Sequence, residues 1–187
     1  MSLEIIKECL NGVLLINNFH VEDYRGGFTK SYEREAFKRI GLNFSVYETF
    51  SSFSAKHVIR GLHFQTIGPQ AKLVSVVSGS AWDVVVDLRL NSPTYMKWYA
   101  QEISQKNHIS VYVPKGFAHG FLSLDNETVM LYQCDGNYNR GSDTGIRFDD
   151  PDIGIRWPIE LNEAIVSEKD KCLMSFKEYE KNPIVLG

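Results

Sequence analysis

The chain has 187 residues, of which 43% are hydrophobic and 23% are charged, and its formal net charge is −3. This length and composition suit one globular domain with a sizeable core and argue against a disordered or fibrous protein. The small negative charge provides no overall basic field of the kind that draws proteins to nucleic acid or to an anionic membrane, so neither is expected as a partner.

The amino-terminal residues and the cysteines favour a cytoplasmic location. Residues 1–10, MSLEIIKECL, lack the basic start and the long apolar stretch of a signal peptide. No apolar run approaches the roughly 20 residues that span a bilayer. Cys9, Cys134 and Cys172 are odd in number and have no CxxC spacing, which fits reduced thiols better than a disulfide framework.

Short segments rich in β-branched and aromatic residues alternate with turn residues along most of the chain. Helical periodicity is confined to residues 32–41 and 175–182. No repeat or linker divides the chain, so we expect one mainly β domain over 1–187, a sandwich or barrel, with residues 159–187 packed on it. In chain order, strands are predicted over 12–17, 71–79, 81–90, 97–104, 108–114, 120–124 and 128–135, and residues 58–73 are expected to form a strand that ends in a loop and returns as a strand.

The segment 81–88, AWDVVVDL, alternates in the manner of a half-buried strand. Val84 and Val86 share one face, whereas Asp83 and Val85 share the other. A long glycine-rich loop, CDGNYNRGSDTG, covers residues 134–145, and loops of this length often carry function.

The segment 58–73, VIRGLHFQTIGPQAKL, sets Arg60, His63 and Lys72 among strand-forming residues. Alternation along two consecutive strands permits His63 and Lys72 to point into one cavity. The same stretch also fits a solvated lysine, a surface ion pair and a hydrogen-bonded core histidine. Taken alone, this segment leaves both interpretations open.

A second polar segment is VPKGFAHGF, residues 113–121, whose Pro114, Gly116 and His119 match the P-x-G-x-x-H pattern of cupins. A cupin barrel commonly holds a metal with several histidines, so a metal site has to be considered. Here Gln65 stands where the second histidine of such a set is expected, and the Lys72 ammonium would repel a cation in the same cavity. We therefore expect no metal.

Without a metal, the same residues offer the parts of a proton-transfer site. An imidazole such as His63 suits a general base, a fixed lysine stabilises an oxyanion, and a tyrosine serves as the acid. Tyr132 and Tyr138 are the candidates for the acid. Tyr132 equally suits the core, since it shares a strand face with Met130, and Tyr138 equally suits a loop anchor.

Several segments together resemble the dTDP-4-dehydrorhamnose 3,5-epimerases and their nucleotide-sugar relatives, in order and with matching spacing from about Phe19 to Asp170. The resemblance implies a cupin double-stranded β-helix, or jelly roll, with small peripheral helices, and a homodimer that uses no cofactor. The matching segments are DYRGGF (23–28), VIRGLHFQ (58–65), PQAKL (69–73), DVVVDLRLNSPTYMKW (83–98), VPKGFAHGFLSL (113–124), LYQCDGNY (131–138), DDPDIGIRWP (149–158) and VSEKD (166–170).

The resemblance implies catalytic roles for five residues. His63 would abstract the proton α to the C4 ketone of a nucleotide-linked 4-keto-6-deoxy sugar, and Asp170 would stabilise its cationic form. Lys72 would stabilise the enolate. Tyr132 would return a proton from the opposite face of the sugar, with Tyr138 close by.

The resemblance also implies a set of substrate contacts, and this chain departs from the family pattern at some of them. Lys30 stands where the family usually has a base-reading glutamate, Glu48 and Phe50 replace the outer residues of a Q-D-N triplet, and Asp143 replaces a glutamate. Because these changes alter the hydrogen-bonding groups offered to the substrate, the sequence does not identify the nucleotide or the sugar. The predicted contacts are Arg25, Phe28, Lys30, Glu48, Phe50, Arg60, Gln65, His119, Asp143 and Lys169.

The sequence therefore predicts an epimerase that inverts C3, C5 or both in a nucleotide-diphosphate-linked 4-keto sugar. Two alternatives stay open at this point. One is a 3,4-ketoisomerase or dehydratase built on the same scaffold, and the other is a binding module without catalytic activity.

Overall fold

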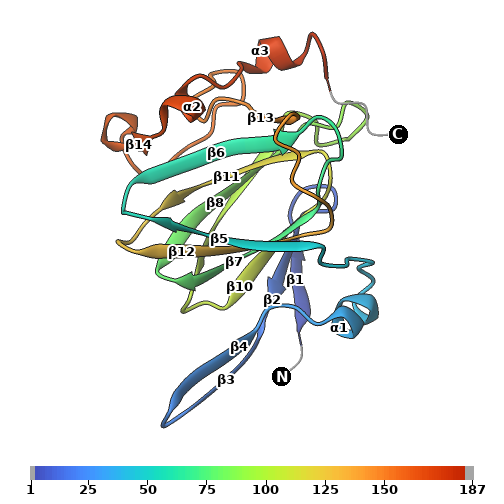
Figure 1. The fold of residues 1–187 in the computed structure, drawn as a ribbon, viewed down its shortest axis with the longest axis vertical. Coiled ribbons are helices and arrows are strands. Elements are labelled where there is room, and N and C mark those ends of the chain that lie inside the picture. The colour runs from blue at the N-terminus through green and yellow to red at the C-terminus, as the bar shows by residue number, and fades with distance from the viewer. Residues whose placement is uncertain (1–2, 184–187) are drawn as a thin grey trace.

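The computed structural model describes residues 3–183 and contains two facing sheets with a separate hairpin (Figure 1). Its architecture confirms the predicted mainly β class. The first sheet is antiparallel and has the order β1 (Glu4–Glu8), β2 (Leu14–Asn17), β10 (Ile109–Val113), β7 (Lys72–Ser78), β12 (Thr128–Cys134) and β5 (Glu48–Ser54).

The second sheet lies against the first and is also antiparallel, except for one short added strand. Its order is β13 (Asp143–Gly145), β6 (Val58–Gln65), β11 (Phe117–Ser123), β8 (Ser80–Asp87) and β9 (Trp98–Ser104), and β14 (Ile165–Val166) pairs with β6 in parallel.

The remaining elements are peripheral. β3 (Phe19–Asp23) and β4 (Gly26–Lys30) form the hairpin, which projects from the lower end of the sheets in Figure 1. Three short helices and one 3₁₀ turn lie outside the sheets: α1 (Arg34–Arg39), η1 (Leu161–Glu163), α2 (Glu168–Lys171) and α3 (Phe176–Tyr179).

The main core lies between the two sheets. Alternate residues of β12, among them Met130 and Tyr132, are buried and meet Val85 of β8 and Phe121 of β11 in one apolar cluster. This is the period of two that the sequence predicts, and burial of such side chains is the main favourable contribution to folding.

The outer face of the second sheet is covered by the carboxy-terminal segment. Val84 and Val86 pack in one cluster with Phe176 and Tyr179 of α3, and the Tyr179 hydroxyl donates to the carbonyl of Leu88 at 2.8 Å. Every residue of β11 is therefore buried. The single domain expected over 1–187 stays a prediction, and the last four residues of the expected covering segment, 184–187, lie outside the described residues.

The predicted elements match the observed ones best in the middle of the chain. The strand–loop–strand order expected over 58–73 is confirmed by β6 and β7, whereas the strand predicted over 120–124 begins at Phe117 and the two helices are shorter than predicted. β1, β3, β4, β5, β13 and β14 were not predicted. β5 reads ETFSSFS and lacks an apolar stripe because its inner face meets a polar cavity instead of the core.

β6 and β11 approach each other closely at two glycines. A Cβ on Gly120 would lie 2.6 Å from the carbonyl oxygen of Arg60 and 3.2 Å from the Cα of Gly61. At this irregularity in the pairing, His119 of β11 stands directly opposite His63 of β6. The two histidine motifs of the sequence thus meet on one face of the sheet.

We predict that Gly120→Ala lowers the free energy of unfolding by about 1–3 kcal/mol, because the added methyl group meets backbone atoms that cannot move aside. Urea denaturation of both proteins measures the change. Gly136→Ala is the matched control, since its Cβ would meet only the Cγ of Gln70, at an ordinary 3.6 Å. Equal losses in the two variants would show that the contact between β6 and β11 is not tight.

Candidate functional site

A cavity of about 770 Å³, counting its open mouth, lies between the two sheets. The space within it that is open to water-sized molecules is about 210 Å³. The first sheet contributes Phe50 and Ser52 from β5, Lys72 from β7 and Tyr132 from β12. The second sheet contributes Arg60 and His63 from β6 and His119 from β11. The lining is completed by Tyr138 from the glycine-rich loop and Asp143 from β13.

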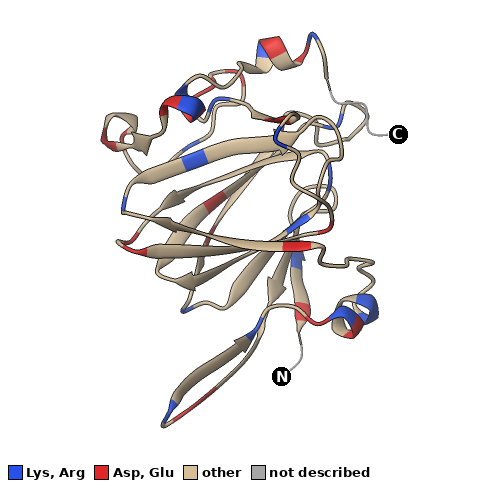
Figure 2. Ribbon diagram, viewed as in Figure 1, with Lys and Arg blue, Asp and Glu red and all other residues tan. Residues whose placement is uncertain are grey.

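The cavity collects charged groups that are scarce elsewhere in the sheets. In Figure 2 most charged residues lie on helices, loops and the β3–β4 hairpin, and the strands carry few. Two of those few, Arg60 and Lys72, line the cavity. Two basic groups in one concave site point to an anionic ligand or an anionic intermediate.

His63 is held by a carboxylate from the far end of the sequence. Its Nε2 donates to Oδ1 of Asp170 at 2.8 Å, and the backbone N–H of Gly61 donates to Oδ2 at 3.1 Å. Burial opposes ionisation of Asp170, but these hydrogen bonds and the His63 charge outweigh it and lower the pKa of the carboxyl group. Because an ionised carboxylate only accepts, Nε2 carries the proton and Nδ1 keeps a free lone pair.

Helix α2 places Asp170. Ser167 caps this helix by accepting from the backbone N–H of Asp170 at 3.1 Å, in the manner of a usual N-cap serine. The carboxylate is buried, with 4% of Asp170 exposed. The sequence prediction of a His63–Asp170 pair is confirmed as a contact.

His119 forms a second, deeper pair. Its Nε2 donates to Oδ2 of Asp83 at 2.6 Å, and both residues are buried. Asp83 was not among the predicted site residues. One feature of the sequence could have indicated Asp83: its carboxylate interrupts the apolar residues of 81–88, where a buried strand normally carries an apolar side chain.

Lys72 begins β7 with its ammonium inside the cavity. Burial lowers the pKa of Lys72, and nearby Cys134, Asp143, Asp83 and Glu48 oppose that effect. Burial in turn raises the pKa of the Cys134 thiol to about 11, so this neighbour is neutral at physiological pH. Burial thus removes water from the Lys72 amine, and a positive charge in such surroundings acts more strongly on a bound anion than it does in water.

Tyr132 lies on the wall opposite His63, since β12 belongs to the first sheet and β6 to the second. Its ring stacks on Phe50 with centroids 4.8 Å apart and planes at 13°. Burial raises the pKa of Tyr132, which keeps the phenol protonated at neutral pH. A protonated phenol and an imidazole therefore face one cavity from two sheets.

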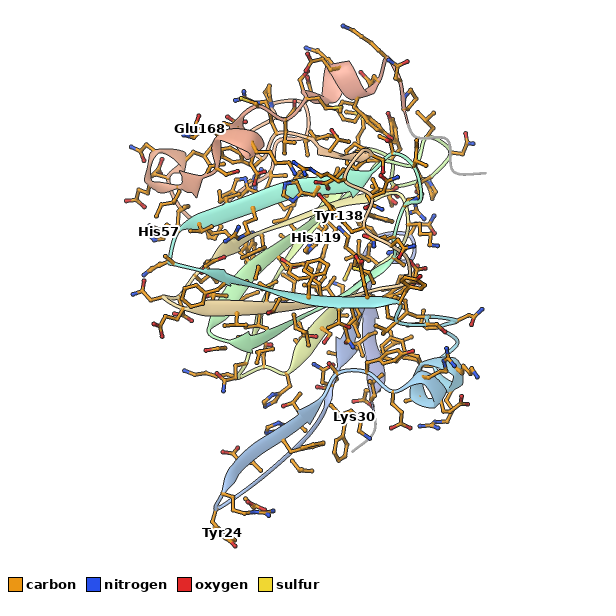
Figure 3. The ribbon with its side chains drawn as sticks, viewed as in Figure 1. Tyr24, Lys30, His57, His119, Tyr138 and Glu168 are labelled. Atoms are coloured by element: carbon orange, nitrogen blue, oxygen red, sulfur yellow. The ribbon has the colours of Figure 1, made fainter. Side chains whose placement is uncertain are left out.

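The glycine-rich loop brings Tyr138 and Asp143 to the cavity. The Tyr138 hydroxyl donates to Oδ2 of Asp143 at 3.2 Å, and Lys169 donates to the same oxygen at 2.6 Å. The hydrogen bond with Asp143 raises the pKa of Lys169. The labels of Tyr138 and His119 stand close together in Figure 3, and both residues line the cavity. Lys169 supports the rim through Asp143 and is not itself part of the lining.

Glu48 and Gln65 hold this loop in place. The carboxylate of Glu48 accepts from the Tyr138 N–H at 3.0 Å and from Nε2 of Gln70 at 2.9 Å. Gln65 accepts from the N–H of Asn139 at 2.7 Å and donates to the carbonyl of Asn137 in the same loop and to that of Gly68 in the loop after β6. Both were predicted as substrate contacts, yet the atoms that could make such contacts already bind the loop. Gln70 was not predicted.

Arg60 is fixed by strand β5. Its Nε donates to the hydroxyl of Ser54 at 3.0 Å and one terminal nitrogen donates to the carbonyl of Phe53 at 2.9 Å. These bonds orient the guanidinium at the cavity wall, where it remains available for a phosphate or carboxylate group.

Three predicted contacts lie on the hairpin, away from the cavity. Arg25, Phe28 and Lys30 belong to the β3–β4 hairpin, and Figure 3 shows Lys30 and Tyr24 far from His119. Arg25 is paired with Asp23 at 2.6 Å and Lys30 with Glu33 at 2.9 Å. Within one chain, the hairpin does not bring these side chains to the site.

The described residues contain neither a candidate metal site nor a membrane-spanning helix. Among residues 3–183, no three His, Cys, Asp or Glu side chains gather in a set that could hold a metal ion. None of the helices in this range is long and apolar enough to cross a membrane.

We predict that Lys72→Met raises the free energy of unfolding at neutral pH. Because burial lowers the folded-state pKa of Lys72, the unfolded chain binds more protons between that pKa and about 10.4, and stability rises with pH in this window. The gain from Lys72→Met is therefore full below the folded pKa, shrinks across this window and vanishes above about 10.4. Urea denaturation across pH measures the gain, and exposed Lys56→Met is the control. A loss of stability at neutral pH would contradict a desolvated ammonium.

Comparison with known proteins agrees with this geometry. A family model described as dTDP-4-dehydrorhamnose 3,5-epimerase matches residues 7–178. The dTDP-4-dehydrorhamnose 3,5-epimerase of Methanothermobacter thermautotrophicus is 42% identical over 186 residues, 99% of either chain.

Solved structures superpose over nearly the whole chain. The dTDP-4-dehydrorhamnose 3,5-epimerase of Bacillus anthracis, with TDP and PPi bound, has a TM-score of 0.89 at 36% identity and covers 94% of this chain and 100% of its own. The dTDP-6-deoxy-D-glucose-3,5-epimerase of Legionella pneumophila, in complex with dTDP-4-keto-L-rhamnose, has a TM-score of 0.91 at 32% identity and covers 100% of both chains. The expected cupin jelly roll is confirmed, and the chain belongs to the dTDP-4-dehydrorhamnose 3,5-epimerase family.

Proposed function

We propose that the protein is an isomerase that inverts C3 and C5 of a dTDP-linked 4-keto-6-deoxy sugar. The observation that carries the proposal is the placement of an imidazole base and a phenol acid on facing sheets of one cavity that also holds a buried ammonium. The described residues supply base, acid and oxyanion stabiliser, so the proposed reaction uses no metal or cofactor.

His63 acts as the general base. Nδ1 carries the free lone pair because Nε2 donates to Asp170, and the carboxylate stabilises the imidazolium that forms. In a gluco-configured sugar the protons on C3 and C5 lie on the same face of the ring, so one base reaches both after a small shift of the substrate. General base catalysis of this kind contributes about 10²–10⁴-fold.

Lys72 stabilises the enolate at C4. C3 and C5 are both α to the C4 carbonyl, so each carbanion places its charge on the same oxygen, and one ammonium assists both steps. Because Lys72 is desolvated, its attraction for that oxygen is stronger than in water. The ammonium and the base therefore have to reach their atoms while the substrate is bound in one orientation.

Tyr132 returns the proton from the opposite face. Inversion requires that the carbon loses its proton on one side of the ring and gains another on the other side. The base comes from β6 and the acid from β12, which belong to different sheets. The raised pKa of Tyr132 keeps its proton in place until the enolate is formed.

The nucleotide assignment draws on the relatives. The Bacillus anthracis protein binds TDP, and the Legionella pneumophila protein binds dTDP-4-keto-L-rhamnose. Arg60 lies at the cavity wall, where it suits the diphosphate. Tyr138 is 55% exposed at the mouth and offers an aromatic face for a base. Of the three departures, Lys30 lies on the hairpin, away from the cavity, whereas Glu48 and Phe50 belong to β5 and Phe50 lines the cavity.

A second copy of the chain accounts for the predicted contacts on the hairpin. Arg25, Phe28 and Lys30 do not reach their own cavity, so they contact substrate only where the hairpin of one protomer enters the site of its partner. The hairpin suits such a role because its apolar side chains are exposed, with Phe28 56% and Val21 49% accessible. The proposed assembly is a homodimer.

The cytoplasmic location is part of the same proposal. Cys9, Cys134 and Cys172 are free thiols, as expected for a reducing compartment.

We predict that His63→Ala abolishes solvent deuterium incorporation at C3 and C5 of the dTDP-linked 4-keto sugar while dTDP still raises the melting temperature, because the base is lost but the nucleotide contacts remain. NMR of the product in D₂O measures both the exchange and the position of the carbonyl. The control is His57→Asn, since His57 lies on a surface turn at φ 67° that asparagine tolerates.

Unchanged exchange in His63→Ala would remove His63 from its role. A product in which the carbonyl has moved from C4 to C3 would identify a ketoisomerase. Nucleotide binding with no exchange in the wild-type protein would identify a binding module.

A further inference from the structure

The inner face of β5 carries residues that lie beside the proposed acid. β5 is the edge strand of the first sheet and pairs with β12, so that Phe50 stands opposite Tyr132 and Ser52 stands opposite Met130. Directly opposed residues point to the same side of a sheet, and a diagonal neighbour is within reach of an aromatic side chain. Phe50, Ser52 and Tyr132 accordingly line the same cavity.

Ser52 has a buried hydroxyl that no protein group satisfies. Its Oγ is shielded from solvent and makes no hydrogen bond with any residue in 3–183. The neighbouring serines differ: Ser54 accepts from Nε of Arg60 at 3.0 Å, and Ser51 is exposed. A buried hydroxyl without a partner is unfavourable and rare, and in a cavity wall it indicates a partner that arises during function.

Tyr132 becomes an anion in the proposed reaction, and its surroundings disfavour that anion. The ring is held between Phe50, stacked at 4.8 Å, and the edge of His119 at 5.9 Å, and neither contact donates a hydrogen bond to the phenol oxygen. Burial raises the pKa of Tyr132, whereas a contact of hydrogen-bonding type with the Ser52 hydroxyl and the charge of Arg60 act to lower it. This contact does not meet the geometry of a hydrogen bond in the structure, so the Ser52 hydroxyl is near the phenol but not yet bonded to it. Ser52 is therefore close enough to influence the phenol oxygen.

We propose that Ser52 is a positioning residue for the acid, and that its hydroxyl donates a hydrogen bond to the phenol oxygen of Tyr132 as the phenol gives up its proton. The inference rests on the proposed function, because it requires Tyr132 to be the acid. A hydrogen bond to an anion is about twice as strong as one between neutral groups. Since this bond strengthens only as charge develops, it accelerates the chemical step without tightening substrate binding.

The protons balance over one inversion. His63 takes a proton from the substrate carbon and becomes an imidazolium, and Tyr132 gives its proton to the same carbon on the other face and becomes a phenolate. Ser52 keeps its own proton throughout and only donates a hydrogen bond. The site resets when the imidazolium releases one proton to water and the phenolate takes one from water.

The test compares Ser52→Ala with the wild-type protein in D₂O, using the dTDP-linked 4-keto-6-deoxy sugar. We expect kcat for inversion to fall about ten- to a hundredfold with KM nearly unchanged. His63 still removes and returns protons on its own face, so the ratio of deuterium exchange to inversion rises. Ser52→Thr, which keeps the hydroxyl, restores most of kcat. Ser51→Ala is the matched control on the outward face of the same strand.

A second measurement separates support of the acid from contact with substrate. In a Tyr132→Phe background, Ser52→Ala should leave the residual deuterium exchange unchanged, because the phenol oxygen is already gone. An unchanged kcat in Ser52→Ala, a loss expressed in KM alone, or an equal further loss in the Tyr132→Phe background would each overturn the inference. A wild-type protein that neither exchanges nor inverts this sugar would instead overturn the proposed function.

Discussion

The proposed mechanism depends on a carboxylate that reaches His63, the proposed base, from 107 positions along the chain. Asp170 lies on the short helix α2, and its hydrogen bonds to His63 and to the N–H of Gly61 tie the carboxy-terminal segment to β6. The bond to His63 sets which imidazole nitrogen is free to accept a proton. The packing of Phe176 and Tyr179 over the second sheet keeps this segment in place. Reactivity at His63 is therefore a property of the whole fold.

The two-sheet architecture explains why the reaction can invert a carbon. A single sheet presents its side chains from one direction, whereas two facing sheets present a base and an acid from opposite walls of one cavity. His63 and His119 share the second sheet, and each is bound to a carboxylate. Lys72 and Tyr132 share the first, where burial disfavours a charge on either group. The proposed base, His63, and the proposed acid, Tyr132, therefore lie on different sheets.

Sequence reasoning identified the residues whose motifs are local. The R-G-L-H segment and the P-x-G-x-x-H segment contain His63 and His119, and the two residues pair in register across β6 and β11. The alternation of β8 was also predictable, because Val84 and Val86 follow an apolar period of two. The pairing of Asp170 with His63 came from family resemblance, since two residues 107 positions apart share no local signal.

The sequence did not reveal the residues whose roles depend on an unpredicted strand or on a loop. β5 lacks an apolar pattern, so its inner residue Ser52 was not expected in the cavity. Glu48 and Gln65 were expected to contact substrate, but their side chains hold the glycine-rich loop. The hairpin residues Arg25 and Phe28 follow a family motif, yet a motif does not tell whether a side chain serves its own chain or a partner.

The central claim is that one carbonyl is addressed by Lys72 while His63 and Tyr132 act on opposite faces of the sugar ring. A crystal structure with the dTDP-linked 4-keto sugar, or a stable analogue, measures this most directly. The account predicts the C4 oxygen about 2.7–3.1 Å from Nζ of Lys72, with the ring between the His63 imidazole and the Tyr132 hydroxyl. A C4 oxygen turned away from Lys72, or His63 and Tyr132 on the same face of the ring, would contradict it.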